Sequence, residues 1–378
     1  MRINSSLLFG LLSISPIAQA NFLPSRVTVD HYLAKLGSDQ QVNTAQGIDW
    51  GIVPGPFYTP ELGIGIGVAA VGLYRPDRQQ KNTPLSSLAL TGFVSSTGAF
   101  GFGYENDTFF HHDQWRFYID GDLSHRPLYY WGRGYREGRH RHDRQKYDSS
   151  RFNATPQLLY RLRANTYAGL GWAVSWERAS ALQDKPSGGF SRNPVALNQL
   201  NSGFSLLFSY DTRDFIANPS QGQVLNIHYT DYLPSLGSDN RLKVWDLQYD
   251  RYHPLNDSTL LAWELYSRLA TGQVPWTMLG SLGDSRHLRG YYQGRFRARN
   301  IVTTQLELRK KLSWRHGVVG WVGAGSMSQR PSEVLDGHWL PSVGVGYRFE
   351  FKKRMNVRLD YGVGQRSSGF YFQVGEAF

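Results

Sequence analysis

The chain has 378 residues, a net charge of +11 and no cysteine. The lack of cysteine excludes a disulfide scaffold and cysteine nucleophiles. The sequence has no apolar run of about 18 residues, which excludes a helical membrane protein. The Lys and Arg residues are spread over alternate positions or gathered in one loop, so the charge does not indicate nucleic acid binding. With aromatic residues at 14% and 40 glycines, two candidates remain, a large soluble all-β protein and an outer-membrane β-barrel.

The N-terminus has the features of a secretory signal peptide. Arg2 supplies a positive charge, residues 7–17 an apolar stretch, and residues 18–20 an A-x-A cleavage site. We therefore predict that residues 1–20 are removed on export, with a buried N-terminal strand as the alternative. Residues 21–48 are expected to form a short periplasmic or lumenal extension, and residues 49–378 the main domain.

The main domain is dominated by alternation with a period of two. In the segment 301–312, for example, Leu306 and Leu308 share one face while Glu307 and Arg309 share the other. Because successive side chains of a strand point to opposite faces, each such segment has an apolar face and a charged face. The expected strands number sixteen: 50–58, 62–75, 86–96, 98–110, 113–125, 148–163, 165–178, 201–211, 222–232, 241–254, 258–271, 300–313, 316–327, 338–351, 354–364 and 368–378.

A soluble β-sandwich shows the same alternation, but two features favour a barrel. Aromatic residues concentrate near the ends of the segments, as in the aromatic girdles at membrane interfaces. The polar faces carry both signs of charge, as with Glu264 and Arg268, which is typical of a wet, ion-paired lumen. An even strand number also fits a closed antiparallel transmembrane β-barrel in a Gram-negative outer membrane, as do connections that are long outside and short inside, apart from the inner connections 76–85 and 212–221. The long connections expected outside are 126–147, 179–200, 233–240, 272–299 and 328–337.

Three motifs carry a resemblance to a known family. Residues 280–291 read GSLGDSRHLRGY in a long loop, residues 211–222 read DTRDFIANPSQG, and residues 369–378 read GFYFQVGEAF. They resemble the L-G-G-x-x-x-[VL]-R-G-[FY], D-T-R-D-x-x-x-N-P-x-x-G and G-F-Y-F-S-[IV]-G-E-A-F patterns of the bacterial surface antigen family, the BamA/TamA-type outer-membrane assembly barrels. The resemblance covers about residues 50–378. It implies a sixteen-stranded barrel that works in outer-membrane assembly or in transport of polypeptide or lipid.

The first motif implies a loop that folds back into the lumen, with its arginine held by the barrel wall. By this resemblance Arg289 is the arginine and Glu307 its partner, whereas the position of the family's second acid is Gly323. We therefore expect Arg289 to pair with Glu307 alone and to stack on Trp321. The alternative is an ordinary ion pair that fills the lumen. The loop motif comprises Leu288, Arg289, Gly290 and Tyr291.

The other two motifs lie at a turn and at the last strand. The turn is expected to be structural, because Asp and Asn side chains bond local backbone N–H groups and proline fixes the bend. Its residues are Asp211, Arg213, Asp214, Asn218, Pro219 and Gly222. In the last strand Phe370, Phe372, Val374 and Phe378 are expected on one face, with Glu376 beside them. They form a candidate signal for insertion of the chain by the barrel-assembly machinery, and an ordinary last strand is the alternative.

The segment 126–147 is strongly basic, and two interpretations stay open. It could bind lipopolysaccharide phosphates or be a solvated loop, and His140 and His142 with His125 are only a weak signal for a metal. No nucleophile elbow or paired-carboxylate pattern is present, so no catalytic, cofactor-binding or metal site is predicted and an enzyme is not expected.

The segment 21–48 is too short for the periplasmic repeat domains with which assembly factors of this family receive their clients. The expected partners are outer-membrane lipid and lipopolysaccharide, with no nucleic acid. The main alternative to assembly or transport is a passive porin-like channel or a structural surface protein.

Overall fold

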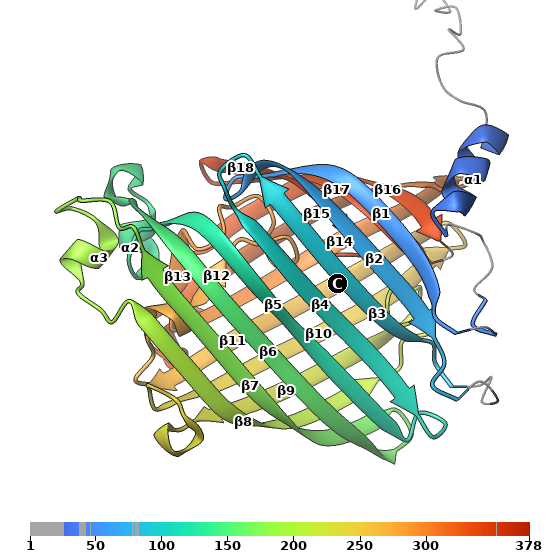
Figure 1. Cartoon of the computed structure of the whole chain (residues 1–378), viewed down its shortest axis with the longest axis horizontal. Helices are drawn as coiled ribbons and strands as arrows, with labels where there is room; N and C mark the ends of the chain where they lie inside the picture. The colour runs from blue at the N-terminus through green and yellow to red at the C-terminus, as the bar shows by residue number, and fades with distance from the viewer. Residues whose placement is uncertain (1–25, 38–42, 46, 78, 80–82, 353) are drawn as a thin grey trace, which may run out of the picture.

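Sixteen antiparallel strands form one sheet that is rolled into a barrel (Figure 1). The computed structural model describes residues 26–37, 43–45, 47–77, 79, 83–352 and 354–378; the predicted signal peptide lies outside the described residues. Each strand of the wall pairs with the next wall strand along the chain, and β11 pairs with β14 across the inserted β12 and β13. This confirms the predicted fold class and strand number. The strands of the wall are β1 (Asp49–Thr59), β2 (Gly63–Tyr74), β3 (Ser86–Ser95), β4 (Phe100–Phe110), β5 (Trp115–Tyr130), β6 (Gln145–Arg163), β7 (Thr166–Ser180), β8 (Asn198–Asp211), β9 (Gly222–Tyr232), β10 (Leu242–Asn256), β11 (Thr259–Gly272), β14 (Asn300–Ser313), β15 (His316–Ser328), β16 (Leu340–Lys352), β17 (Met355–Gly364) and β18 (Ser367–Val374).

The two ends of the barrel differ. Short connections such as 164–165 and 314–315 lie at one end, here called the turn end, together with the longer connection 212–221. The longest connections, 131–144, 181–197 and 273–299, lie at the other end, the loop end. Helix α1 (Arg26–Lys35) lies outside the wall at the turn end, where Asp30 pairs with Arg315 at 3.1 Å (Figure 1). The extension therefore packs on the rim of the barrel. The loops contain α2 (Gly134–Gly138), η1 (Arg141–Asp143), α3 (Gly189–Arg192), η2 (Pro234–Leu236), η3 (Trp276–Met278), η4 (Pro331–Glu333), and a small unpredicted sheet of β12 (Gly280–Leu282) and β13 (Phe296–Ala298).

The wall has its apolar face outside and its charged face inside. Leu306 and Leu308 on β14 are exposed, whereas Glu307 and Arg309, which alternate with them, are buried in the lumen. A soluble protein would bury the apolar face, so this orientation is the one that a lipid environment stabilises. Within the described residues, no helix is both long and apolar enough to cross a bilayer.

The basic segment 126–147 is only partly a loop, which corrects the expectation. The β5–β6 ladder continues from Arg126, opposite Ser149, to Tyr130, opposite Gln145. It extends so far because Tyr130 and other inward side chains of the two strands pack against the loops at the loop end. Arg126 consequently lies in the wall, 3.6 Å from Asp122, and the connecting loop spans 131–144.

A seam separates the first and last strands. β1 and β18 are neighbours in space, yet among the described strands no ladder joins them, whereas every other adjacent pair is hydrogen-bonded. The ring of Phe372 lies in this seam against Gly55, where a Cβ would collide with the ring. Side-chain packing, and not backbone pairing, therefore brings the two edges of the sheet together.

Residues 375–378, here called the tail, leave the sheet and turn into the lumen. Gly375 has a φ of +90°, and after it Glu376 accepts from Arg348 at 2.7 Å and from Asn356 at 2.6 Å. Phe378 is buried against Tyr252 on the far wall, and the chain end lies within the barrel outline in Figure 1. The expectation that Glu376 and Phe378 share the outer face with Phe370, Phe372 and Val374 is therefore wrong for these two residues. The arginines that pair with Glu376 lie inside, and a carboxylate facing hydrocarbon would be costly.

Candidate functional site

The loop 273–299, here called the clamp loop, enters the lumen and touches the wall next to the seam. The Gly290 N–H donates to the Tyr371 hydroxyl on β18 at 3.0 Å. Gly290 has a φ of +107°, and a Cβ there would lie 2.8 Å from the backbone of Val363 on β17. On β17, a Cβ at Gly362 would likewise lie 2.9 Å from the Gly290 nitrogen. Only glycine permits this contact between loop and strand.

Arg289, at the tip of the clamp loop, is fully buried between three strands. Its guanidinium bonds Glu307 on β14 and Asp360 on β17, the latter at 2.6 Å. The guanidinium carbon Cζ lies 3.7 Å from the ring centre of Trp321 on β15. The structure thus brings together the three side chains that the sequence singled out, Arg289, Glu307 and Trp321.

Asp360 corrects the expectation that a single carboxylate holds Arg289. The group of Arg289, Glu307, Asp360 and Trp321 is here called the clamp. Gly323 indeed offers no acid, but β17 supplies one from the opposite side of the guanidinium. The sequence carried a signal for it, since Asp360 lies on the inward face of its segment and begins a D-x-G pattern with Gly362. A buried guanidinium needs opposite charge with matching hydrogen bonds, and two carboxylates satisfy this better than one.

The clamp extends into an ion network that includes the tail. Asp360 also binds Arg348 at 2.5 Å and Arg358 at 2.9 Å. Arg348 in turn holds Glu376 of the tail. The network contains four arginines and three carboxylates, which are Arg289, Arg309, Arg348, Arg358, Glu307, Asp360 and Glu376. Since each carboxylate contacts more than one arginine, loop, wall and tail are held as a unit.

The two other side chains of the loop motif anchor the tip. The Tyr291 hydroxyl donates to the Pro341 carbonyl at 2.5 Å and accepts from the Gln365 N–H at 2.8 Å. Leu288 has a φ of +53° and is buried in an apolar cluster with Phe296 of the same loop. The motif therefore contacts the wall through the charge of Arg289, the hydroxyl of Tyr291 and the apolar side chain of Leu288.

The long loops meet over the loop end of the lumen. Arg295 of the clamp loop donates to the Gly138 carbonyl at 2.8 Å, and the Tyr135 ring stacks on His338, with ring centres 3.8 Å apart. Trp276 of the clamp loop packs in an aromatic cluster with Phe190 of the loop 181–197. These contacts join four loops, so the clamp loop is fixed at the loop end as well as at its tip.

Comparisons with known proteins identify the family. The model of the Omp85 superfamily domain matches residues 84–378. The chain belongs to the Omp85 superfamily. Among solved structures, BamA from Haemophilus ducreyi lacking POTRA domains 1–3 is similar, with a TM-score of 0.52 and 14% identity over 93% of this chain and 77% of that chain. No curated protein matches the chain.

Two CdiB structures are similar as well. CdiB from Escherichia coli has a TM-score of 0.54 and 11% identity, over 90% of this chain and 68% of that one. CdiB from Acinetobacter baumannii has a TM-score of 0.52 and 14% identity over 86% of this chain. The Omp85 barrel described here spans 58% of the length of the latter chain. At these identities the likeness shows the fold alone.

The turn motif of this Omp85 barrel lies at the turn end. Asp211 accepts from the Arg213 N–H at 3.1 Å and binds both the Arg213 and the Arg116 side chains. Gly222 has a φ of +101°, and a Cβ there would collide with the Thr212 carbonyl. The side chain of Asn218 makes no hydrogen bond within the described part of the chain, while Pro219 is buried. The turn is therefore held mainly by the hydrogen bonds and ion pairs of the Asp211 carboxylate.

Asp214 joins this turn to its neighbour. It accepts from the Ser220 N–H at 2.8 Å and pairs with Arg354 of the β16–β17 turn at 2.5 Å. Although burial acts to raise the pKa of the Asp214 carboxyl, the hydrogen bonds from Ser220 and Arg354 hold it at about 2.

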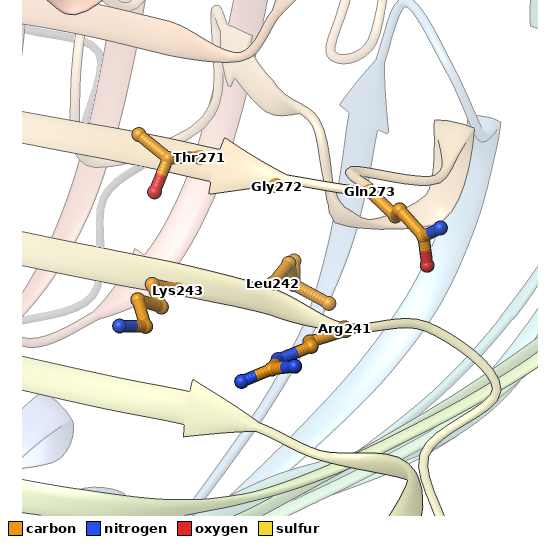
Figure 2. A pocket seen from close by; sticks show the side chains of 6 residues that line it. All are labelled: Arg241, Leu242, Lys243, Thr271, Gly272 and Gln273. Atoms are coloured by element: carbon orange, nitrogen blue, oxygen red, sulfur yellow. The ribbon is translucent and has the colours of Figure 1, made fainter.

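A pocket of about 310 Å³ lies at the loop end, away from the clamp (Figure 2). Arg241, Leu242 and Lys243 line it from the β10 side, and residues 271–273 from the β11 side. No group of three or more His, Asp or Glu suited to a metal occurs in the described ranges. His125 instead stacks on Phe100, with ring centres 5.5 Å apart.

Removal of one carboxylate from the clamp should strongly destabilise the barrel. Glu307→Gln or Asp360→Asn leaves the buried Arg289 charge with only one of its two carboxylate partners. The free energy of unfolding should fall by about 3–5 kcal/mol. Trp321→Ala removes the cation–π contact and leaves a cavity, so it should destabilise as well. Denaturant-induced unfolding in detergent micelles, followed by tryptophan fluorescence for the carboxylate variants and by circular dichroism for Trp321→Ala, measures these changes.

The matched control for this prediction is the exposed Arg330–Glu333 pair. Glu333→Gln should change the stability by well under about 1 kcal/mol because surface ion pairs contribute little. Stabilities of Glu307→Gln and Asp360→Asn equal to that of the control would contradict the clamp.

Asp214 should contribute stability that disappears at low pH. Its pKa of about 2 is below the unfolded value of about 3.9. A carboxyl with a depressed pKa stabilises the fold above its unfolded pKa, and this contribution is lost as the pH falls through the folded value. The Tm of the parent should therefore exceed that of Asp214→Asn at about pH 6 and converge with it near pH 2. A difference in Tm that is independent of pH would refute this assignment.

Proposed function

We propose that this chain is an outer-membrane protein that assists the insertion or passage of polypeptide at the seam between β1 and β18. The observation that carries the proposal is the lack of a ladder at this one junction, while all other adjacent strands are paired. In hydrocarbon, unpaired backbone groups are costly, so barrels normally close completely. An unpaired seam is therefore a feature that needs a function, and membership of the Omp85 superfamily is consistent with assembly or transport.

The short strands beside the seam also support the seam as the place where polypeptide enters or crosses the membrane. At 8 residues β18 is the shortest of the sixteen wall strands, and its neighbours β17 and β1 have 10 and 11 residues. A shorter strand presents a shorter apolar band, and a bilayer thins locally to match it. Lipid beside the seam would thus be thinner and more easily entered by a polypeptide.

The contents of the lumen favour this proposal over the passive channel. Arg289 at the tip of the clamp loop is fully buried, and the tail crosses from β18 to Tyr252 on β10. The loops also contact one another over the loop end. An aqueous pore would be obstructed by these segments, whereas action at the seam needs no open lumen.

A stapled seam should abolish the activity. The purified chain is placed in liposomes, and an unfolded eight-stranded barrel is added as the client, with folding followed by its protease resistance. The chain should accelerate folding, and a disulfide between Gly55→Cys and Phe372→Cys should remove the acceleration until reductant is added. The chain has no native cysteine that could interfere.

The matched control staples a paired junction. Val345→Cys and Tyr361→Cys lie opposite each other on β16 and β17 with both side chains outside, and their disulfide should leave the acceleration intact. If the chain does not accelerate folding, or the seam staple has no effect on it, the proposal is wrong. A steady ion conductance in planar bilayers that is the same with and without either disulfide would instead support the passive channel.

A further inference from the structure

The pocket between β10 and β11 is surrounded by hydrogen-bond donors. Its polar side chains are a guanidinium, an ammonium, a hydroxyl and a carboxamide, from Arg241, Lys243, Thr271 and Gln273. Within the described part of the chain, none of these four side chains makes a hydrogen bond or an ion pair. Two positive charges and two neutral donors therefore face one cavity without an acceptor from the protein.

The donors lie on the outer face of the wall. Lys243 and Thr271 are opposite each other in the β10–β11 register, and both are exposed, whereas Leu242 between them is buried on the inner side. The Arg241 and Lys243 side chains extend to the same side of β10 (Figure 2). The pocket therefore opens toward the surroundings of the barrel and not toward the lumen.

The acids near the pocket do not neutralise its cations. Asp231 on β9 is opposite Lys243 in the register, but the two side chains form no ion pair in the described ranges, and Asp231 instead accepts from the Tyr229 hydroxyl at 3.4 Å. Asp239 in the β9–β10 connection accepts from the Leu200 N–H of β8 at 2.7 Å. Both charges of the pocket are consequently available to a ligand.

A backbone contact fixes the shape of the pocket. Gly272 has a φ of +90°, and a Cβ there would lie 2.7 Å from the Arg241 carbonyl. The Gln273 N–H donates to this same carbonyl at 2.8 Å. Because glycine alone permits such a close approach in this conformation, the end of β11 and the start of β10 are joined at the pocket. Arg241 is therefore held by its backbone although its side chain is free.

The pocket lies at the level where lipid head groups begin. Trp245, two residues from Lys243 on the same outer face, is 45% exposed, and its ring centre is 4.7 Å from that of Tyr229 on β9. Aromatic residues of this kind form the girdles of outer-membrane barrels at the edge of the hydrocarbon. One further repeat of the strand toward the loop end is about 7 Å, so Lys243 lies just beyond the hydrocarbon.

We propose that this pocket binds the phosphate group of an outer-leaflet lipid, of the class represented by the phosphorylated head group of lipopolysaccharide. An arginine binds two phosphate oxygens at once, and a lysine adds a second positive charge. The hydroxyl of Thr271 and the amide of Gln273 supply donors for the remaining oxygens. The acyl chains of the lipid would extend along the outer face past Trp245. The site is separate from the basic segment 126–147, which does not line the pocket.

Lipid binding in phosphate-free detergent tests the site. Native mass spectrometry of the full chain in maltoside micelles measures its affinity for lipid A, the phosphorylated anchor of lipopolysaccharide. Each of Arg241→Gln and Lys243→Gln should weaken binding about fivefold, the contribution typical of one cation near a lipid surface. Both side chains are exposed, so the variants should retain the Tm of the parent.

The matched control is Arg251→Gln. Arg251 lies on the outer face of the same strand near the turn end and is equally exposed, but it does not line the pocket. Its removal should leave lipid A binding unchanged. Lipid A without its phosphates should bind the parent as weakly as phosphorylated lipid A binds the double variant of Arg241→Gln with Lys243→Gln.

Three results would overturn the proposal. The first is equal binding of lipid A by the parent and the double variant, and the second is an equal loss in Arg251→Gln, which would indicate non-specific attraction to any cation. The third is displacement of lipid A by an equal concentration of inorganic phosphate, which would assign the pocket to the free anion. The assay does not involve the seam, so its outcome and that of the stapled-seam experiment are independent.

Discussion

The structure depends on one buried cation. Arg289 lies in the lumen without contact to bulk water, and an arginine cannot lose its charge to relieve the burial. Its guanidinium must therefore be met by carboxylates, which come from Glu307 and Asp360 on strands that are not neighbours in sequence. The clamp loop, β14 and β17 consequently have a fixed relative position, and the part of the wall that ends at the seam is held from within.

The same electrostatic requirement explains the path of the tail. Arg348 pairs with both Asp360 and Glu376 inside the lumen. Glu376, the residue after Gly375, therefore lies inside, and the last strand ends at Val374. This shortens β18 to 8 residues and leaves β1 without a partner near the turn end, where the segment 36–37 takes its place. The clamp and the open seam are thus parts of one arrangement.

The fold could be predicted from the sequence because alternation is a local property, repeated in every strand. The pairing of Arg289 with Glu307 followed from resemblance. Asp360 could not be assigned in advance, because which inward acid reaches the loop depends on the stagger of strands around the barrel, which no local pattern encodes. The inward turn of Glu376 was missed for a related reason. Period-two extrapolation assumes an extended backbone, and Gly375 at a φ of +90° ends it.

The prolines of β1 also change the energy of the unpaired state. In hydrocarbon, each unsatisfied backbone N–H or C=O costs on the order of several kcal/mol. Pro54 and Pro56 have no N–H to leave unsatisfied, and the Ile52 N–H is already bonded to Leu36, so an unpaired β1 leaves few donors unsatisfied, although its carbonyls still lack partners. On β18 the Gly375 N–H donates to the Asn356 carbonyl of β17, so the even-numbered residues 368–374 direct their donors and acceptors toward the seam. The cost of unsatisfied backbone donors at the open seam therefore falls more on β18 than on β1.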